Sequence, residues 1–150
     1  EEVRQTKNYL KNQILMMQRK SKSIAFFPGK FQPVHMGHIT SLMKIFDDYD
    51  KIIIGITSDS PNVLSLKSRK EIFKSVLSRF NKFEYVLFDT ALINIKDTST
   101  LPKFDVCVTG NQSVVNFMEK NNFKTRLLSR SEGVGYSGTE IRSISKNKNS

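Results

Sequence analysis

Residues 24–38 read IAFFPGKFQPVHMGH. The apolar run 24–27 stops abruptly at Pro28-Gly29, a pattern typical of a buried strand that ends in a turn. Two histidines, His35 and His38, then stand three residues apart at the start of a helical pattern. A strand that passes through a glycine turn into a helix is the usual first unit of an α/β fold.

The same order of strand and helix repeats along the chain. Further short apolar runs predict strands at 52–56, 85–88, 105–108 and 126–128, and apolar residues at helical spacing predict helices at 37–48, 72–80 and 114–120. Five strands that alternate with helices predict an α/β fold, a Rossmann-like doubly wound five-stranded parallel sheet with helices on both faces.

The first 22 residues differ from this pattern. They are polar, contain no Gly or Pro, and place Val3, Leu10, Ile14 and Met17 near one face of an amphipathic helix. We expect this stripe to pack on the body of the chain, residues 23–146, or on a neighbouring subunit. The alternative is a linker helix from an additional domain upstream of residue 1. Residues 147–150 form a polar tail.

Composition limits the classes of protein. A length of 150 residues suits one compact domain, and a single cysteine, Cys107, excludes a disulfide framework and favours a reducing, cytoplasmic location. The longest apolar run, 52–56, is far shorter than the roughly 20 residues that span a bilayer, so no membrane partner is expected. The formal charge of +10 indicates anionic partners without choosing among them.

Ligands of open parallel sheets bind beyond the carboxyl ends of the strands. His35 and His38 lie there, on one face of the first turn of a helix, where free N–H groups and the helix dipole attract an anion. Gly37 leaves room for a phosphate near the backbone, and Lys30 adds a mobile positive charge. The other candidates at strand ends are Ser58, Asp59 and the run Thr109, Gly110 and Asn111.

A second glycine-rich stretch, residues 133–142, reads GVGYSGTEIR and leads into a predicted helix. Ser137 or Thr139 can cap that helix beside an anion, and Arg142 suits bidentate contact with phosphate. In isolation an ordinary capped loop explains this stretch as well. With only two histidines and one cysteine, we expect no metal site made of protein side chains.

These motifs together resemble the nucleotidyltransferases with a His-x-Gly-His signature, and among them the archaeal-type nicotinamide mononucleotide (NMN) adenylyltransferases. Residues 29–38 are similar to the Gly-Arg-Phe-Gln-Pro-x-His-x-Gly-His element of that subfamily, residues 109–111 to its Thr-Gly-Asn stretch, and residues 137–142 to its Ser-Gly-Thr-Glu-Ile-Arg motif. The resemblance spans about residues 24–142 and identifies 23–146 as a nucleotidyltransferase domain.

The resemblance implies transfer of AMP from ATP to a phosphorylated acceptor such as NMN, with release of pyrophosphate and with Mg²⁺ held through the phosphates. It implies catalytic roles for His35, His38, Lys30 and Arg142. Further nucleotide-binding positions are Pro28, Gly29, Phe31, Gln32, Gly37, Thr109, Gly110, Asn111, Ser137, Gly138 and Thr139. Arg69 aligns with a basic residue of the family and is expected either on a solvated helix face or, with Ser58 and Asp59, against the ligand.

The sequence departs from the subfamily at three places. Lys30 stands where the subfamily has Arg, only eight residues follow Arg142, and the chain has no Trp, although a Trp after the third strand is typical of the subfamily. Residues 91–100, the corresponding region, contain no aromatic residue.

These departures keep two alternatives open. One is a cytidylyltransferase that uses CTP and a phospho-alcohol or phospho-sugar acid. The other, of a different class, is a non-catalytic regulator that binds nucleotide or nucleic acid, although no nucleic-acid motif is visible. We expect a homo-oligomer and no nucleic-acid partner.

Overall fold

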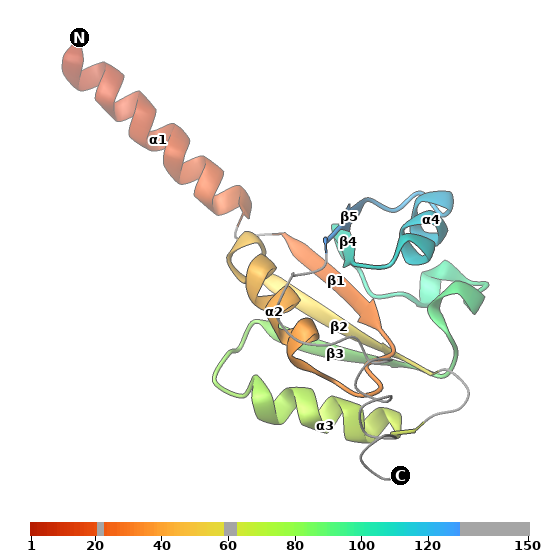
Figure 1. Cartoon of the computed structure of the whole chain (residues 1–150). Helices are drawn as coiled ribbons and strands as arrows, with labels where there is room; N and C mark the ends of the chain where they lie inside the picture. Colours follow the sequence, from red (N-terminus) through yellow and green to blue (C-terminus); the bar gives the residue numbers. More distant parts are fainter. Residues whose placement is uncertain (21–22, 59–62, 130–150) are drawn as a thin grey trace.

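The computed structural model describes residues 1–20, 23–58 and 63–129, which form a five-stranded sheet with helices on both faces (Figure 1). The sheet order is β3-β2-β1-β4-β5, and every neighbouring pair is parallel. The strands are β1 (Ile24–Gly29), β2 (Lys51–Thr57), β3 (Phe83–Phe88), β4 (Val106–Thr109) and β5 (Thr125–Leu127). The helices are α1 (Glu2–Lys20), α2 (Met36–Ile45), α3 (Leu66–Val76) and α4 (Gln112–Lys120), with short 3₁₀ turns η1 (Phe46–Asp48), η2 (Leu92–Asn94) and η3 (Thr98–Thr100). This confirms the predicted fold class.

Two hydrophobic clusters lie on opposite faces of the sheet. Successive side chains of a strand point to opposite faces, so Phe27 joins one cluster and Phe26 the other. Helices α2 and α3 cover the first face, and α4 with η2 and η3 covers the second (Figure 1). The fully buried members include Ala25, Leu42, Ile45, Ile52, Ile54, Ile56 and Phe73 on the first face, and Cys107 and Met118 on the second. The central strands are therefore buried on both sides, which explains their continuous apolar runs.

Two predicted helices have different bounds. Helix α3 begins at Leu66 and ends at Val76, not at 72–80, because the hydroxyl of Ser65 caps it by accepting a hydrogen bond from the Ser68 N–H (3.0 Å). Ile72 and Val76 are exposed, and Phe73 is the apolar side chain of this helix that is fully buried. The helix predicted over 37–48 ends as α2 at Ile45 and continues as the 3₁₀ turn η1.

Helix α1 does not pack on the domain body, contrary to one expectation. It extends away from the sheet (Figure 1), and Val3, Leu10, Ile14 and Met17 keep between 53% and 69% of their surface exposed. Packing on a neighbouring subunit and a linker role stay predictions. Of the helices described, none is long and apolar enough to cross a membrane.

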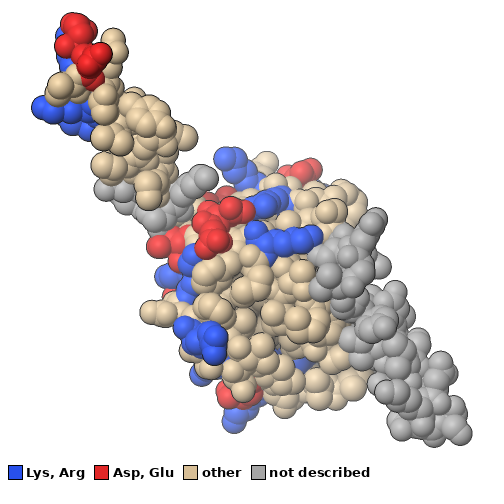
Figure 2. Space-filling model, turned by 60° about the vertical axis from the view of Figure 1, so that its left-hand side comes forward, with Lys and Arg blue, Asp and Glu red and all other residues tan. Residues whose placement is uncertain are grey.

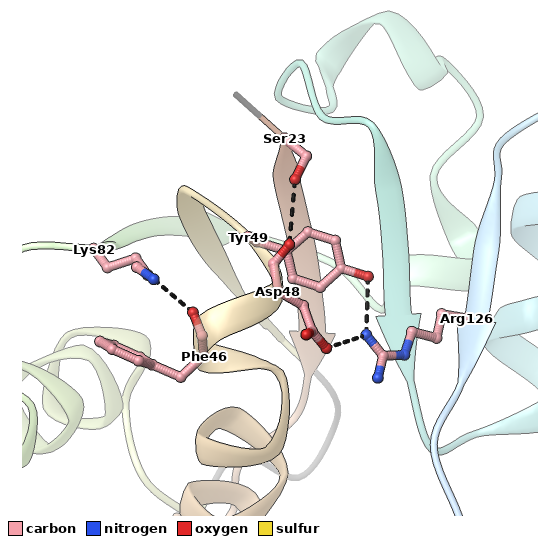
Figure 3. Close-up of polar contacts among 6 residues, drawn as sticks. All are labelled: Ser23, Phe46, Asp48, Tyr49, Lys82 and Arg126. Carbon is pink, nitrogen blue, oxygen red and sulfur yellow. Dashed lines mark hydrogen bonds and ion pairs between the residues drawn. The ribbon is translucent and has the colours of Figure 1, made fainter. Parts of the chain in front are cut away.

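Polar contacts tie the helices to the amino ends of the strands (Figure 3). Arg126 of β5 donates to the Asp48 carboxylate (2.8 Å) and to the Tyr49 hydroxyl (3.2 Å), both just before β2. Lys82, just before β3, donates to the carbonyl of Phe46 at 2.6 Å, and its ammonium lies 4.1 Å from the centre of the Phe46 ring. These contacts leave the opposite, carboxyl edge of the sheet open.

Candidate functional site

A cleft of about 560 Å³ opens at the carboxyl edge of the sheet. It lies beyond β1 and β2 and beside the start of α4, where the strand order changes direction between β1 and β4. Its lining residues are Pro28, Gly29, Lys30, Phe31, Gln32, Pro33, His38, Thr57, Ala91, Leu92, Ile93, Asn94, Asn111, Ser113 and Val114. This is the place where open parallel sheets bind ligands.

The two histidines form a reciprocal cap at the start of α2. His35 is the N-cap, and its Nδ1 accepts a hydrogen bond from the Gly37 N–H (3.0 Å), while Nδ1 of His38 accepts one from the His35 N–H (3.1 Å). The two rings stack with centroids 3.7 Å apart. Since a ring nitrogen that accepts a hydrogen bond carries no proton, each neutral imidazole has its proton on Nε2. The proton on Nε2 of His38, whose ring lines the cleft, can therefore be donated in a hydrogen bond to a ligand.

Phe31 packs against this cap through the ring of His38. It has a positive φ of 54°, is only 3% exposed, and its ring meets the His38 ring edge to face with centroids 4.8 Å apart. Gly29 is required here, because a Cβ on Gly29 would lie 2.7 Å from the tip of the Phe31 ring. Phe31 lines the cleft, its ring is almost fully buried against Gly29 and His38, and its role in nucleotide binding stays a prediction.

The pKa of His38 is lowered to about 3, first by burial and then by the electrostatic interaction with His35. His38 is therefore neutral at physiological pH. A neutral imidazole with its proton on Nε2 can donate a hydrogen bond from that nitrogen to a phosphate oxygen.

Gln32 and Arg69 connect the loop after β1 to the chain after β2. The side-chain oxygen of Gln32 accepts hydrogen bonds from the N–H groups of Val63 (2.6 Å) and Leu64 (3.3 Å). The prediction of Arg69 on a solvated face is wrong, because its side chain is 0% exposed and donates to backbone carbonyls behind the cleft. Burial lowers the pKa of Arg69.

Residues 109–111 turn the chain from β4 into α4. Thr109 is buried, and its hydroxyl accepts a hydrogen bond from the Asn111 N–H at 3.1 Å. Asn111 caps α4, with its side-chain oxygen accepting from the Ser113 N–H at 2.9 Å. Asn111 thus caps α4 and also lines the cleft, and its contact with a nucleotide stays a prediction. Gly110 is exposed beside it and does not line the cleft.

Several predicted residues lie elsewhere. Besides Gly110 and Arg69, the predicted residues that are described but do not line the cleft are His35, Gly37, Ser58 and Thr109. Ser58 donates its N–H to the carbonyl of Thr90 (3.3 Å). Asp59, Ser137, Gly138, Thr139 and Arg142 lie outside the described residues.

Sequence reasoning missed Ser113 and Val114 as cleft residues. Their signal is the Asn cap of α4, which places the first turn of that helix beside the ligand site.

Charge and metal-ligating groups complete the description. On the face shown in Figure 2, Lys and Arg side chains alternate with Asp and Glu and form no continuous basic stripe. Across the part of the chain that the structure describes, no group of three or more His, Cys, Asp or Glu side chains could hold a metal ion.

A family model described as Cytidylyltransferase-like matches residues 26–144. Nicotinamide-nucleotide adenylyltransferase of Methanococcus vannielii is 33% identical over 132 residues, which cover 79% of this chain and 74% of that relative. Phosphopantetheine adenylyltransferase of Vesicomyosocius okutanii is 31% identical over 98 residues, which cover 64% of this chain and 60% of that relative.

Solved structures share the fold. A bifunctional NMN adenylyltransferase/ADP ribose pyrophosphatase from Francisella tularensis superposes with a TM-score of 0.67 at 19% identity, covering 85% of this chain and 43% of that chain. Its complex with AMP and a manganese ion gives a TM-score of 0.62 at 18% identity. The chain therefore spans less than half the length of that protein. Since the family match includes the sheet, the cleft and both histidines, the chain belongs to the Cytidylyltransferase-like family of nucleotidyltransferases.

Proposed function

We propose that this chain is a Mg²⁺-dependent adenylyltransferase that transfers AMP from ATP to NMN and releases pyrophosphate. The observation that carries the proposal is the reciprocal cap of His35 and His38 at the start of α2, which leaves the proton of His38 on Nε2 while the His38 ring lines the cleft. The positive end of a helix dipole and a neutral donor suit a phosphate chain. The adenylyltransferases among the relatives support the choice of nucleotide.

The reaction needs positioning more than a protein nucleophile. A phosphate oxygen of the acceptor attacks the α-phosphorus of ATP, the bond from that phosphorus to the bridging oxygen breaks, and pyrophosphate leaves with the electron pair. The Nε2–H groups of His35 and His38 donate to the oxygens of the α-phosphate, and Lys30 adds positive charge nearby. Removing one such donor costs roughly 2.7 to 4 kcal/mol of transition-state stabilisation.

Mg²⁺ fits this site as an ion held mainly by phosphate oxygens and water, because the described residues supply no cage of acidic side chains. When bound, it would offset the negative charge that develops on the leaving pyrophosphate. The complex of the Francisella tularensis protein with AMP and a manganese ion supports a divalent cation in this fold.

The remaining contacts follow the family pattern. Asn111 at the start of α4 is proposed to read the edge of the base, with Thr109 and Gly110 shaping the turn. Ser137, Gly138, Thr139 and Arg142 are proposed to hold the β- and γ-phosphates, by the resemblance of residues 137–142 alone.

One observation favours a second candidate for the acceptor. The cleft wall after β3 consists of Ala91, Leu92, Ile93 and Asn94, and the one aromatic residue among the described cleft residues, Phe31, is almost fully buried. An aliphatic wall suits an acceptor without a flat ring, such as phosphopantetheine or a phospho-alcohol, at least as well as nicotinamide. The activity would then be adenylyl or cytidylyl transfer to that acceptor.

The test is pyrophosphate release with Mg²⁺ from ATP or CTP, each combined with NMN, nicotinate mononucleotide, phosphopantetheine, glycerol 3-phosphate and phosphocholine. Turnover of ATP with NMN supports the first candidate. Turnover with another acceptor, or with CTP, supports the second candidate. Silence in every combination contradicts transferase activity and favours the non-catalytic regulator, which a salt-sensitive nucleic-acid binding assay would then examine.

A further inference from the structure

Arg69 is a buried cation directly behind the proposed phosphate site. Its guanidinium donates hydrogen bonds to the carbonyls of Lys30 and Thr57, the latter at 2.8 Å, and its Nε donates to the carbonyl of Ser65 at 3.3 Å. Lys30 follows the last residue of β1, Thr57 ends β2, and Ser65 caps α3. One side chain therefore joins three backbone segments that meet at the cleft.

Two other side chains join the same segments independently. The Thr57 hydroxyl donates to the carbonyl of Gly29 (3.2 Å), and Gln32 accepts from the N–H groups of residues 63 and 64. The loop after β1 is thus fixed to the chain after β2 at residues 29, 30 and 32. Arg69 is the only one of these three side chains that reaches from α3, and it also brings a charge.

The same face of α3 supports the histidine cap. Phe73 lies four residues after Arg69, so the two side chains occupy one helical face. The Phe73 ring meets the Phe31 ring edge to face with centroids 4.8 Å apart, and Phe31 in turn meets His38 at 4.8 Å. Through Arg69 and Phe73, α3 therefore holds both the backbone of the loop and the ring beneath His38.

On the basis of the proposed function, we propose that Arg69 is a positioning residue for nucleotidyl transfer. It fixes the exits of β1 and β2 so that His38, at the start of α2, meets the triphosphate in one geometry. Its positive charge, enclosed in protein, offsets the carbonyl dipoles at these strand ends that would otherwise repel an anion in the cleft.

The test compares the wild type with Arg69→Met, which removes the charge at similar length, and Arg69→Lys, which keeps it. The matched control is Leu77→Ala, which removes a buried side chain at the far end of α3. We would measure kcat and KM for ATP, calorimetric affinity for tripolyphosphate, thermal unfolding, and the carbonyl ¹³C shifts of residues 30 and 57.

We expect Arg69→Met to lower kcat roughly 100-fold, as misplaced reacting groups do, and to weaken tripolyphosphate binding. Arg69→Lys should recover part of both losses. Leu77→Ala should unfold at lower temperature yet keep the wild-type kcat, because it leaves the strand exits intact. Equal kcat and tripolyphosphate affinity in Arg69→Met and Leu77→Ala would overturn the inference.

Two outcomes need separate treatment. If Arg69→Met does not fold, Arg69→Lys decides, and a kcat equal to that of Leu77→Ala overturns the positioning role. If the wild type turns over no acceptor, the proposed transferase function fails by itself. The role of Arg69 at the anion site is then judged by the tripolyphosphate affinity and by the carbonyl ¹³C shifts of residues 30 and 57. Values in Arg69→Lys equal to those of the wild type would overturn this role.

Discussion

The low pKa of His38 makes folding stability depend on pH in a defined window. The ordinary value of 6.5 applies to the unfolded chain, and the folded value is about 3. As pH falls below about 6.5, His38 binds a proton in the unfolded state but stays neutral in the folded state. The free energy of unfolding therefore decreases until about pH 3. At about pH 5, roughly 1.5 units below the unfolded value, the loss is about 2 kcal/mol at about 1.36 kcal/mol per unit.

Urea unfolding of the wild type and of His38→Asn, at about pH 7.5 and about pH 5, checks this value. The Asn side chain cannot titrate in this range, while its oxygen can still accept the hydrogen bond from the His35 N–H. Titrating groups that do not contact His38 contribute equally to both proteins, so their pH effects cancel in the comparison. We expect the wild type to lose about 2 kcal/mol more than the variant over this range. Equal losses in the two proteins would refute the assignment of a neutral, buried His38.

Three further predictions follow from the packing. Gly29→Ala should destabilise the fold by about 1 to 3 kcal/mol, because its Cβ would press on the ring of Phe31 at 2.7 Å, whereas Gly110→Ala, with 3.6 Å to its nearest neighbour, should unfold in urea as the wild type does. Cys107, whose pKa is raised to about 12 by burial, should resist a thiol reagent at about pH 8 in the folded state, and fast labelling there would contradict its burial. Arg126→Gln should cost less than about 1 kcal/mol in thermal or urea unfolding, since both partners of its ion pair are 40% to 45% exposed, and a larger loss would show that the contact is more strongly coupled to the fold.

The parallel direction of the strands and their alternation with helices could be predicted from the sequence because each buried strand is a short apolar run with a helical period after it. The site at the start of α2 could be predicted for a similar reason, since capping and the spacing of His35 and His38 act within one helical turn. Strand positions shifted by only one or two residues, because end residues such as Thr109 and Thr125 are polar and carry little hydrophobic signal.

The burial of Arg69, the burial of the Phe31 ring and the surface that α1 meets could not be predicted, each for a tertiary reason. An arginine on a helix normally faces water, and here the ends of two strands supply the carbonyls that allow its burial. Phe31 lines the cleft, but its positive φ and its burial depend on packing that the motif does not specify. The apolar stripe of α1 has helical spacing, but spacing alone does not specify which surface it meets.

The contacts of Arg126 and Lys82 with the turn before β2 lie at the edge of the sheet opposite the cleft, and the wall of Ala91 to Asn94 takes no part in them. Leu92 in that wall belongs to the buried core, whereas Ile93 and Asn94 are exposed, so mutations at these two positions can accumulate during evolution without weakening the bonds that assemble the sheet. Such mutations would change the surface of the cleft while the core and the contacts at the opposite edge keep the sheet folded.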